Sequence, residues 1–181
     1  MGFLLSKIWK SDMPVLMIGL DYAGKASILY YLKEKIGKNS LIKYPSRYKT
    51  FFNYKGLNII DIDLGGGCDK ILRRRDIQHF LGKIEGIIFV IDSGDIDRLE
   101  EVCNCFDILL SNKGLNNQPI LVLANKQDLN GSLCINDIIK KLEIEKIKDR
   151  DWILLGTSVK TGEGIEEGFD WLITILNKRQ I

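Results

Sequence analysis

A run of nine residues near the N-terminus has the residue types and the spacing needed to hold a polyphosphate. Gly19 and Gly24 have four residues between them, and Lys25 follows directly. Glycine lets the backbone approach phosphate oxygens closely, and the lysine can reach the outer phosphates. The pattern therefore indicates a nucleotide-binding loop. The residues expected to surround the phosphates are Gly19, Asp21, Tyr22, Ala23, Gly24, Lys25, Ala26 and Ser27.

The position directly after the lysine departs from this pattern. A phosphate loop that holds Mg²⁺ places a serine or threonine there, so that the hydroxyl can bind the metal. Ala26 has no hydroxyl. Ser27 follows, but neighbouring helical residues point about 100° apart, so its hydroxyl does not simply take over.

Three further motifs follow predicted strands. Asp63 can hold Mg²⁺ through water, and Gly66 can direct a backbone N–H at a terminal phosphate, although D-x-x-G alone is more often a turn. Asp128 can accept hydrogen bonds from the N1–H and amine of guanine, a pair that adenine does not offer. These residues therefore favour a guanine nucleotide. The full guanine-binding set is expected to be Asn125, Lys126, Asp128, Ser158, Val159 and Lys160.

The elements that must position these residues follow an alternating strand and helix pattern. This pattern predicts an α/β fold with a six-stranded, mostly parallel sheet covered by helices on both faces. Strands are predicted at 15–18, 50–54, 58–62, 86–91, 120–124 and 152–155, and helices at 26–34, 97–111, 135–142 and 165–177. Lys55 and Gly56 predict a hairpin, expected as the one antiparallel pair. Ligands bind at the carboxyl ends of such strands, where the motifs fall.

Composition fits one compact, soluble domain in the cytoplasm. The chain has 181 residues, of which 45% are hydrophobic and 28% charged. A net charge of +2 is too small to indicate nucleic acid as a partner. The four cysteines have no metal-type spacing and are interpreted as reduced thiols. No apolar run is long enough to span a bilayer, and no cleavable signal is recognised.

The first twelve residues predict a separate membrane-binding segment. Gly2 and Ser6 match the N-myristoylation pattern. Apolar residues with interspersed lysines continue as a short amphipathic helix, the second anchor that one acyl chain needs. A frayed or core-docked helix is the alternative. Residues 1–12 are thus expected to form a myristoylated helix, and residues 13–181 the nucleotide-binding domain.

Taken together, the motifs resemble the small GTPases, specifically the ADP-ribosylation factor and Arf-like family. The resemblance rests on Gly2, Gly19 to Asp21, Asp63 to Gly66, 86–93, 124–129 and 168–172. It implies a P-loop small GTPase fold that binds GTP and GDP with Mg²⁺. It further implies a monomer on endomembranes such as the Golgi, with an exchange factor, a GTPase-activating protein and effectors as partners.

The departures from the family gather around the metal and the reacting phosphate. Ala26 replaces the metal-binding hydroxyl, and Gly67 stands where the family has its water-orienting glutamine. The resemblance makes Ser46 the candidate for the second metal hydroxyl, with Thr50 a weaker one. Asp61 shares a strand face with Asp63, so it is either a compensating metal ligand or a solvated strand position.

Two functions remain open at this point. The chain is either a working switch whose hydrolysis is weak or depends on a partner, or a pseudo-GTPase membrane scaffold with no hydrolytic cycle. No catalytic side chain is assigned.

Overall fold

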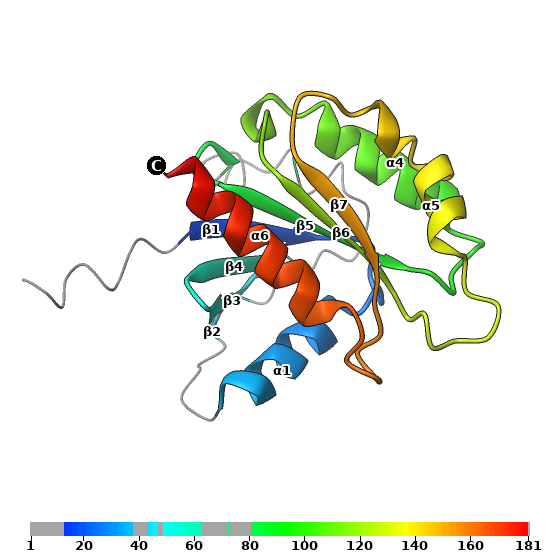
Figure 1. The fold of residues 1–181 in the computed structure, drawn as a ribbon, viewed down its shortest axis with the longest axis horizontal. Helices are drawn as coiled ribbons and strands as arrows, with labels where there is room; N and C mark the ends of the chain where they lie inside the picture. Colours follow the sequence, from blue (N-terminus) through cyan, green and yellow to red (C-terminus); the bar gives the residue numbers. More distant parts are fainter. Residues whose placement is uncertain (1–12, 38–42, 47–48, 63–71, 73–80, 181) are drawn as a thin grey trace, which may run out of the picture.

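The computed structural model describes residues 13–37, 43–46, 49–62, 72 and 81–180 (Figure 1), with only the backbone for 43–46 and 49. The predictions for the helix over residues 1–12 and for Gly2, Asp63, Gly66 and Gly67 lie outside these residues. They remain predictions.

One mixed sheet organises the described part of the chain. Its strands are β1 (Met13–Ile18), β2 (Lys43–Ser46), β3 (Lys49–Tyr54), β4 (Leu57–Ile62), β5 (Gly86–Asp92), β6 (Ile120–Asn125) and β7 (Trp152–Gly156). They lie in the order β2-β3-β4-β1-β5-β6-β7. All six predicted strands are present. The strands β4, β1, β5, β6 and β7 run parallel to one another, which confirms the expected α/β fold.

The sheet has one short strand more than expected. The edge strand β2 pairs antiparallel with β3, so the hairpin of β3 and β4 is not the one antiparallel pair. β2 was missed because it has only four residues, of which Pro45 cannot donate to a ladder. A proline is tolerated there because β2 lies at the edge.

The predicted hairpin between β3 and β4 is confirmed. Lys55 and Gly56 have φ angles of 48° and 90°. Positive φ at both central residues is typical of a type I′ turn, whose twist matches that of the flanking strands. The hairpin therefore fixes the register of β4, in which Asp61 lies opposite Thr50 of β3.

Helices cover both faces of the sheet, as Figure 1 shows. α1 (Lys25–Ile36) and α6 (Ile165–Arg179) lie on one face, and α4 (Leu99–Leu110) and α5 (Ile135–Lys141) lie on the other. Successive residues of a strand point to opposite faces. Accordingly Val15 and Met17 pack with α1 and α6, whereas Leu16 and Ile18 pack with α4. Hydrophobic clusters thus pack against both faces of β1, so the loop that follows β1 starts from a rigidly held strand.

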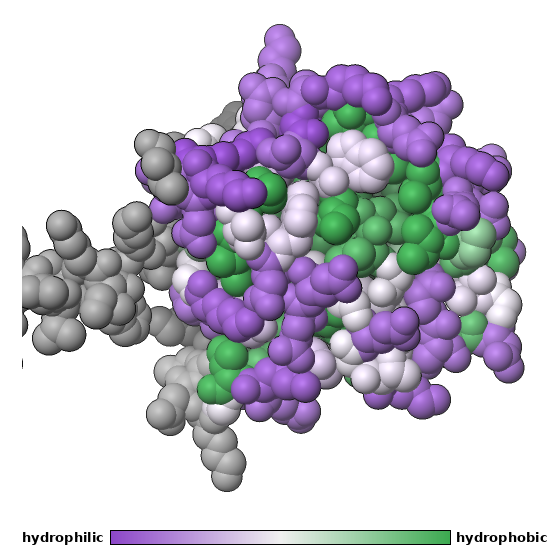
Figure 2. Space-filling view, viewed as in Figure 1, coloured by the Kyte–Doolittle hydropathy of each residue, from purple (hydrophilic) through white to green (hydrophobic). Residues whose placement is uncertain are grey.

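The surface is mostly polar, with an apolar band over the edge strand β7 between α6 and the pair α4 and α5 (Figure 2). Four of the five residues of β7 are only half-buried. Among the described helices, none combines the length and the apolar character required to cross a bilayer.

The cysteines differ from the expectation of reduced thiols throughout. Cys103 and Cys134 are free. Cys105, a buried residue of α4, is disulfide-bonded.

Candidate nucleotide site

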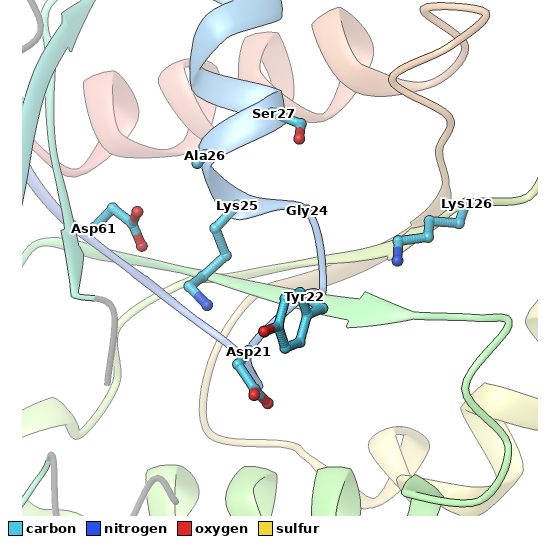
Figure 3. A pocket seen from close by; sticks show the side chains of 8 residues that line it. All are labelled: Asp21, Tyr22, Gly24, Lys25, Ala26, Ser27, Asp61 and Lys126. Atoms are coloured by element: carbon cyan, nitrogen blue, oxygen red, sulfur yellow. The ribbon is translucent and has the colours of Figure 1, made fainter. Parts of the chain in front are cut away.

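The loops that leave β1, β5, β6 and β7 meet at the carboxyl edge of the sheet. β1 lies between β4 and β5, so its loop stands where the chain connections diverge, the usual ligand position in such sheets. A cavity of about 540 Å³ opens at this point (Figure 3). Its lining consists of Asp21, Tyr22, Gly24, Lys25, Ala26, Ser27, Asp61 and Lys126.

The start of α1 is built to receive an anion. The first N–H groups of a helix have no acceptor within the helix, and the helix dipole adds partial positive charge. α1 has no side-chain cap and no acidic residue in its first turn. Its N–H groups therefore face the cavity without a competing carboxylate of their own turn.

Lys25 is held close to the loop. Its side chain is 6% exposed, and its Nζ donates hydrogen bonds to the carbonyl oxygens of Gly19 (3.0 Å) and Leu20 (2.9 Å). The ammonium is thereby fixed at the floor of the cavity, where it can attract the outer phosphates of a nucleotide.

A second cavity, of about 200 Å³, continues from the first towards the loops after β6 and β7. Gly24, Ser27 and Lys126 line both cavities. The second is completed by Asn125, Asp128, Leu129, Val159 and Lys160. The two cavities together offer a phosphate-binding end and a base-binding end.

The neighbours of Asp128 at the base end stabilise its ionised carboxylate. The Ser158 hydroxyl donates a 2.6 Å hydrogen bond to its Oδ1, and Lys160 Nζ lies 4.0 Å from its Oδ2. The hydrogen bond from Ser158 holds the pKa of Asp128 below its ordinary value, and the positive charges of Lys160 and Lys126 act in the same direction. At neutral pH the carboxylate can therefore accept hydrogen bonds from two N–H donors on the edge of a guanine.

Asn125 joins the base end to the phosphate end. Its Nδ2 donates to the Ala23 carbonyl oxygen at 2.9 Å, and its Oδ1 accepts from the Thr157 hydroxyl at 3.4 Å. Asn125 is 2% exposed. One buried amide thus links the loops after β1, β6 and β7.

Lys126 is positioned by a neighbouring strand. Its backbone has a φ of 66°, and its Nζ lies 2.5 Å from Oδ2 of Asp92 at the end of β5. The ion pair leaves the aliphatic stem of Lys126 beside both cavities, where a purine ring can lie along it.

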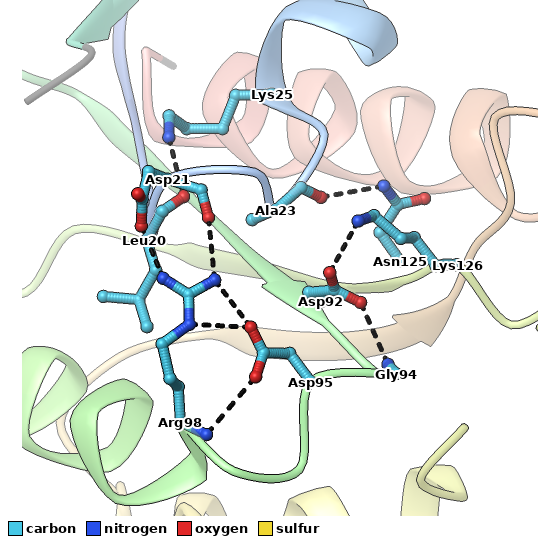
Figure 4. A network of polar contacts seen from close by, with 10 residues as sticks. All are labelled: Leu20, Asp21, Ala23, Lys25, Asp92, Gly94, Asp95, Arg98, Asn125 and Lys126. Carbon is cyan, nitrogen blue, oxygen red and sulfur yellow. Dashed lines mark hydrogen bonds and ion pairs between the residues drawn. The ribbon is translucent and has the colours of Figure 1, made fainter. Parts of the chain in front are cut away.

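Arg98 holds the opposite side of the phosphate loop, an arrangement drawn in Figure 4. Its guanidinium lies 2.5 Å from Oδ1 of Asp21 and 2.6 Å from Oδ2 of Asp95. The hydrogen bond from Arg98 holds the pKa of Asp95 below its ordinary value. Sequence reasoning missed Arg98 because no local pattern connects it with a loop 77 residues away.

The structure brings most of the predicted site residues together. Gly19 and Ala23 do not line the cavities but supply carbonyl acceptors to Lys25 and Asn125. Ser158 lies behind Asp128. For Ser46, at the end of β2, only the backbone is described. Leu129 lines the base end and was not predicted.

The described residues fit a nucleotide. A Cβ on Gly24 would lie 2.3 Å from Asn125 Nδ2, so the loop can pass between the two ends of the site only as glycine. For the Mg²⁺ that accompanies such nucleotides, Ala26 offers no ligand atom. Asp61 places a carboxylate, a ligand type suited to a hard cation, in the same cavity.

The strand order, the phosphate loop after β1 and the acidic base-binding loop after β6 define a P-loop small GTPase fold. The chain matches the model of the ADP-ribosylation factor family over residues 2–176. It is 34% identical over 181 residues to ADP-ribosylation factor-like protein 1 of Saccharomyces cerevisiae (98% of this chain, 96% of the relative). It is 38% identical over 170 residues to ADP-ribosylation factor J of Dictyostelium discoideum (94% and 88%). The chain therefore belongs to the ADP-ribosylation factor family.

Membership of the family sets the general activity. The chain is a small GTPase, a switch that binds GTP and GDP, and Mg²⁺ is the usual companion of the nucleotide. The family also implies exchange factors, GTPase-activating proteins, effectors and reversible membrane association.

Proposed function

We propose that the chain is an Arf-like guanine-nucleotide switch that recruits effectors in vesicular trafficking or membrane organisation, and that it hydrolyses GTP weakly or only with a partner's help. One observation carries the proposal: two joined cavities share Gly24, Ser27 and Lys126, and Ala26 lies beside the phosphate end.

Guanine selectivity resides in Asp128. Its ionised carboxylate, supported by Ser158, accepts from the N1–H and the amine of guanine. Adenine presents an acceptor at N1, which would leave the carboxylate facing a lone pair. A polar mismatch of this kind between the carboxylate and the base discriminates strongly between guanine and adenine.

Slow hydrolysis follows from two missing groups. Ala26 provides no hydroxyl for Mg²⁺, and Gly67, outside the described residues, provides no amide to orient the attacking water. A bound Mg²⁺ neutralises charge that develops on the phosphates, and a positioned water is the nucleophile. Lys25 and the N–H groups of α1 remain to bind and orient the phosphates. Ser46 and Asp63 are the further proposed metal ligands.

Membrane attachment is assigned to the N-terminus. Myristate on Gly2 and the amphipathic helix over residues 1–12 are two weak anchors, and the membrane binding that they give together is reversible. On this proposal the protein is a cytoplasmic monomer that visits endomembranes such as the Golgi.

The alternative function is a pseudo-GTPase scaffold that recruits partners without a hydrolytic cycle. Ala26 is the observation that favours it, because the residue removes a metal ligand from an otherwise intact phosphate loop.

Calorimetric titration of nucleotide-stripped protein tests the proposal. The ligands are GDP and a non-hydrolysable GTP analogue, each with Mg²⁺ and with EDTA, and ADP serves as the control for the base. We expect binding of both guanine nucleotides, strengthened by Mg²⁺, and no comparable binding of ADP. Absent or Mg²⁺-indifferent binding supports the scaffold, and equal binding of ADP refutes guanine selectivity.

Single-turnover hydrolysis tests the catalytic part. We expect the double substitution Ala26→Thr and Gly67→Gln to raise the rate, with Ala26→Thr alone as the partial variant. An unchanged rate would mean that loss of these two groups is not the cause of slow hydrolysis.

A further inference from the structure

We propose that the carboxylate of Asp61 binds Mg²⁺ in place of the hydroxyl that is missing at position 26. The inference rests on the proposed nucleotide function and identifies how this chain retains a metal at that site.

Asp61 is a rigidly placed, buried acidic side chain. It lies in β4, in register with Met17 of β1 on one side and with Thr50 of β3 on the other. Its residue is 4% exposed. A side chain carried by the middle of a sheet is held more firmly than one on a loop, as a metal ligand requires.

The carboxylate reaches the place where the hydroxyl is missing. Asp61 and Ala26 line the same cavity, and Figure 3 shows the Asp61 side chain extending from β4 towards the start of α1, where Lys25 and Ala26 stand. Since Ala26 ends at its methyl group, an oxygen from β4 has room to approach a cation at the phosphates.

The other carboxylate of this cavity, that of Asp21, is paired with an arginine. Asp21 lies 2.5 Å from the Arg98 guanidinium, which also donates to the Asp21 backbone carbonyl at 3.3 Å. A guanidinium remains charged at all relevant pH values. Among the described residues that line the cavity, Asp61 is the other acidic side chain, and Figure 3 shows it on the side of Ala26.

Charge balance gives the same assignment. Phosphates brought beside a buried carboxylate repel it, and the low local dielectric strengthens the repulsion. A divalent cation between the carboxylate and the phosphates converts that repulsion into two attractions. Mg²⁺ prefers such oxygen ligands and is usually bound by one or two carboxylates together with phosphate oxygens.

The test compares GDP affinity with Mg²⁺ and with EDTA in wild type and in Asp61→Asn, which keeps the size of the side chain and removes its charge. We expect Asp61→Asn to reduce the Mg²⁺-dependent gain in GDP affinity by at least about tenfold. Mutation of a residue that supports a metal ligand typically lowers metal affinity by about this factor. Affinity in EDTA should stay equal or rise. Asp170→Asn removes an exposed carboxylate from α6 and serves as the charge-matched control, with no change expected.

A rescue variant separates metal binding from general damage. Adding Ala26→Thr to Asp61→Asn returns a hydroxyl to the site and should restore most of the Mg²⁺-dependent gain. Binding of Mn²⁺, followed by its paramagnetic resonance in the presence of GDP, should weaken and recover in the same order. Should Asp61→Asn not fold by circular dichroism, Asp61→Cys replaces it, and the thiolate should shift the preference from Mg²⁺ towards Cd²⁺.

Three results would overturn the inference. An unchanged Mg²⁺ effect in the Asp61 variant means that Asp61 is not a ligand. If Asp61→Asn binds GDP more tightly than wild type by the same factor with and without Mg²⁺, the carboxylate only repels phosphate. Wild-type protein that binds no guanine nucleotide in either condition instead refutes the proposed function, and the inference falls with it.

Discussion

Substitution of Gly24 by alanine should reveal how closely the two ends of the nucleotide site are joined. Gly24 caps the start of α1 with a φ of 97°, and an added Cβ would lie 2.3 Å from Asn125 Nδ2. The same Nδ2 donates to the Ala23 carbonyl oxygen at 2.9 Å. The new methyl group therefore has to displace the amide that links the loops.

The expected cost has two parts. An alanine at positive φ costs about 1–2 kcal/mol. Losing the buried hydrogen bond between Asn125 and Ala23 costs about 1 kcal/mol more. Together they amount to roughly 2–3 kcal/mol of unfolding free energy.

Gly131→Ala is the matched control for this prediction. Gly131 has a φ of 84° with no heavy atom within 4 Å of an added Cβ, so it carries the backbone cost alone. Urea unfolding in EDTA without nucleotide should find Gly24→Ala less stable than Gly131→Ala by about 1 kcal/mol, equivalent to roughly 2–4 °C in melting temperature.

Addition of GDP should separate the two variants further. Because Gly24 lines both cavities, GDP should stabilise Gly131→Ala as it does wild type and should stabilise Gly24→Ala much less. Equal losses of stability in the two variants, or equal stabilisation by GDP, would refute the link through Asn125.

Three other perturbations address separate parts of the molecule. Arg98→Met should lower stability at neutral pH and make stability depend less on acid: Arg98 lowers the pKa of Asp95, so the stability that this pair adds to the wild type is present above the ordinary carboxyl pKa of about 3.9 and is lost as pH falls through the lowered value, whereas the variant has no such contribution to lose. Urea unfolding between pH 7 and pH 3 measures this, and parallel pH curves for variant and wild type would contradict it. Ser158→Ala should raise the pKa of Asp128 towards its ordinary value, which NMR of the Asp128 carboxyl carbon tests directly; no upward shift would mean that the hydroxyl does not stabilise the carboxylate. Gly2→Ala should release the protein from membranes in cells that contain the acyltransferase, and unchanged recovery in the membrane fraction would remove myristate from the mechanism.

The parts of the fold that sequence predicted are those with a dense local signal. Long apolar runs indicated the strands around β1, β5 and β6, and the hairpin was predictable because only Lys55 and Gly56 separate its two strands. β2 was not predicted because its four residues, one of them a proline, show neither an alternation of polar and apolar residues nor an apolar run. Local signal is strongest where neighbours in sequence are also neighbours in space.

The same rule explains which residues of the nucleotide site could be predicted from the sequence. Gly24, Lys25 and Asp128 were predictable because phosphate and base contacts come from short contiguous motifs. Arg98 was not, because its charge meets Asp21 only after β1 and β5 lie side by side. The metal and hydrolysis residues Ser46, Asp63 and Gly67 stay predictions, since their side chains lie outside the described residues.

The amide of Asn125 has a practical consequence for anyone redesigning the base preference of this protein. Because that single side chain serves the Ala23 carbonyl as well as the loop after β7, altering it would change phosphate affinity together with base choice. The hydrogen bond and the ion pair of Asp128 join it to Ser158 and Lys160, which both belong to the base end. A library of variants selected for binding another nucleobase should therefore keep position 125 constant and vary position 128 and its neighbours. Changes there can alter base selectivity while phosphate binding is retained.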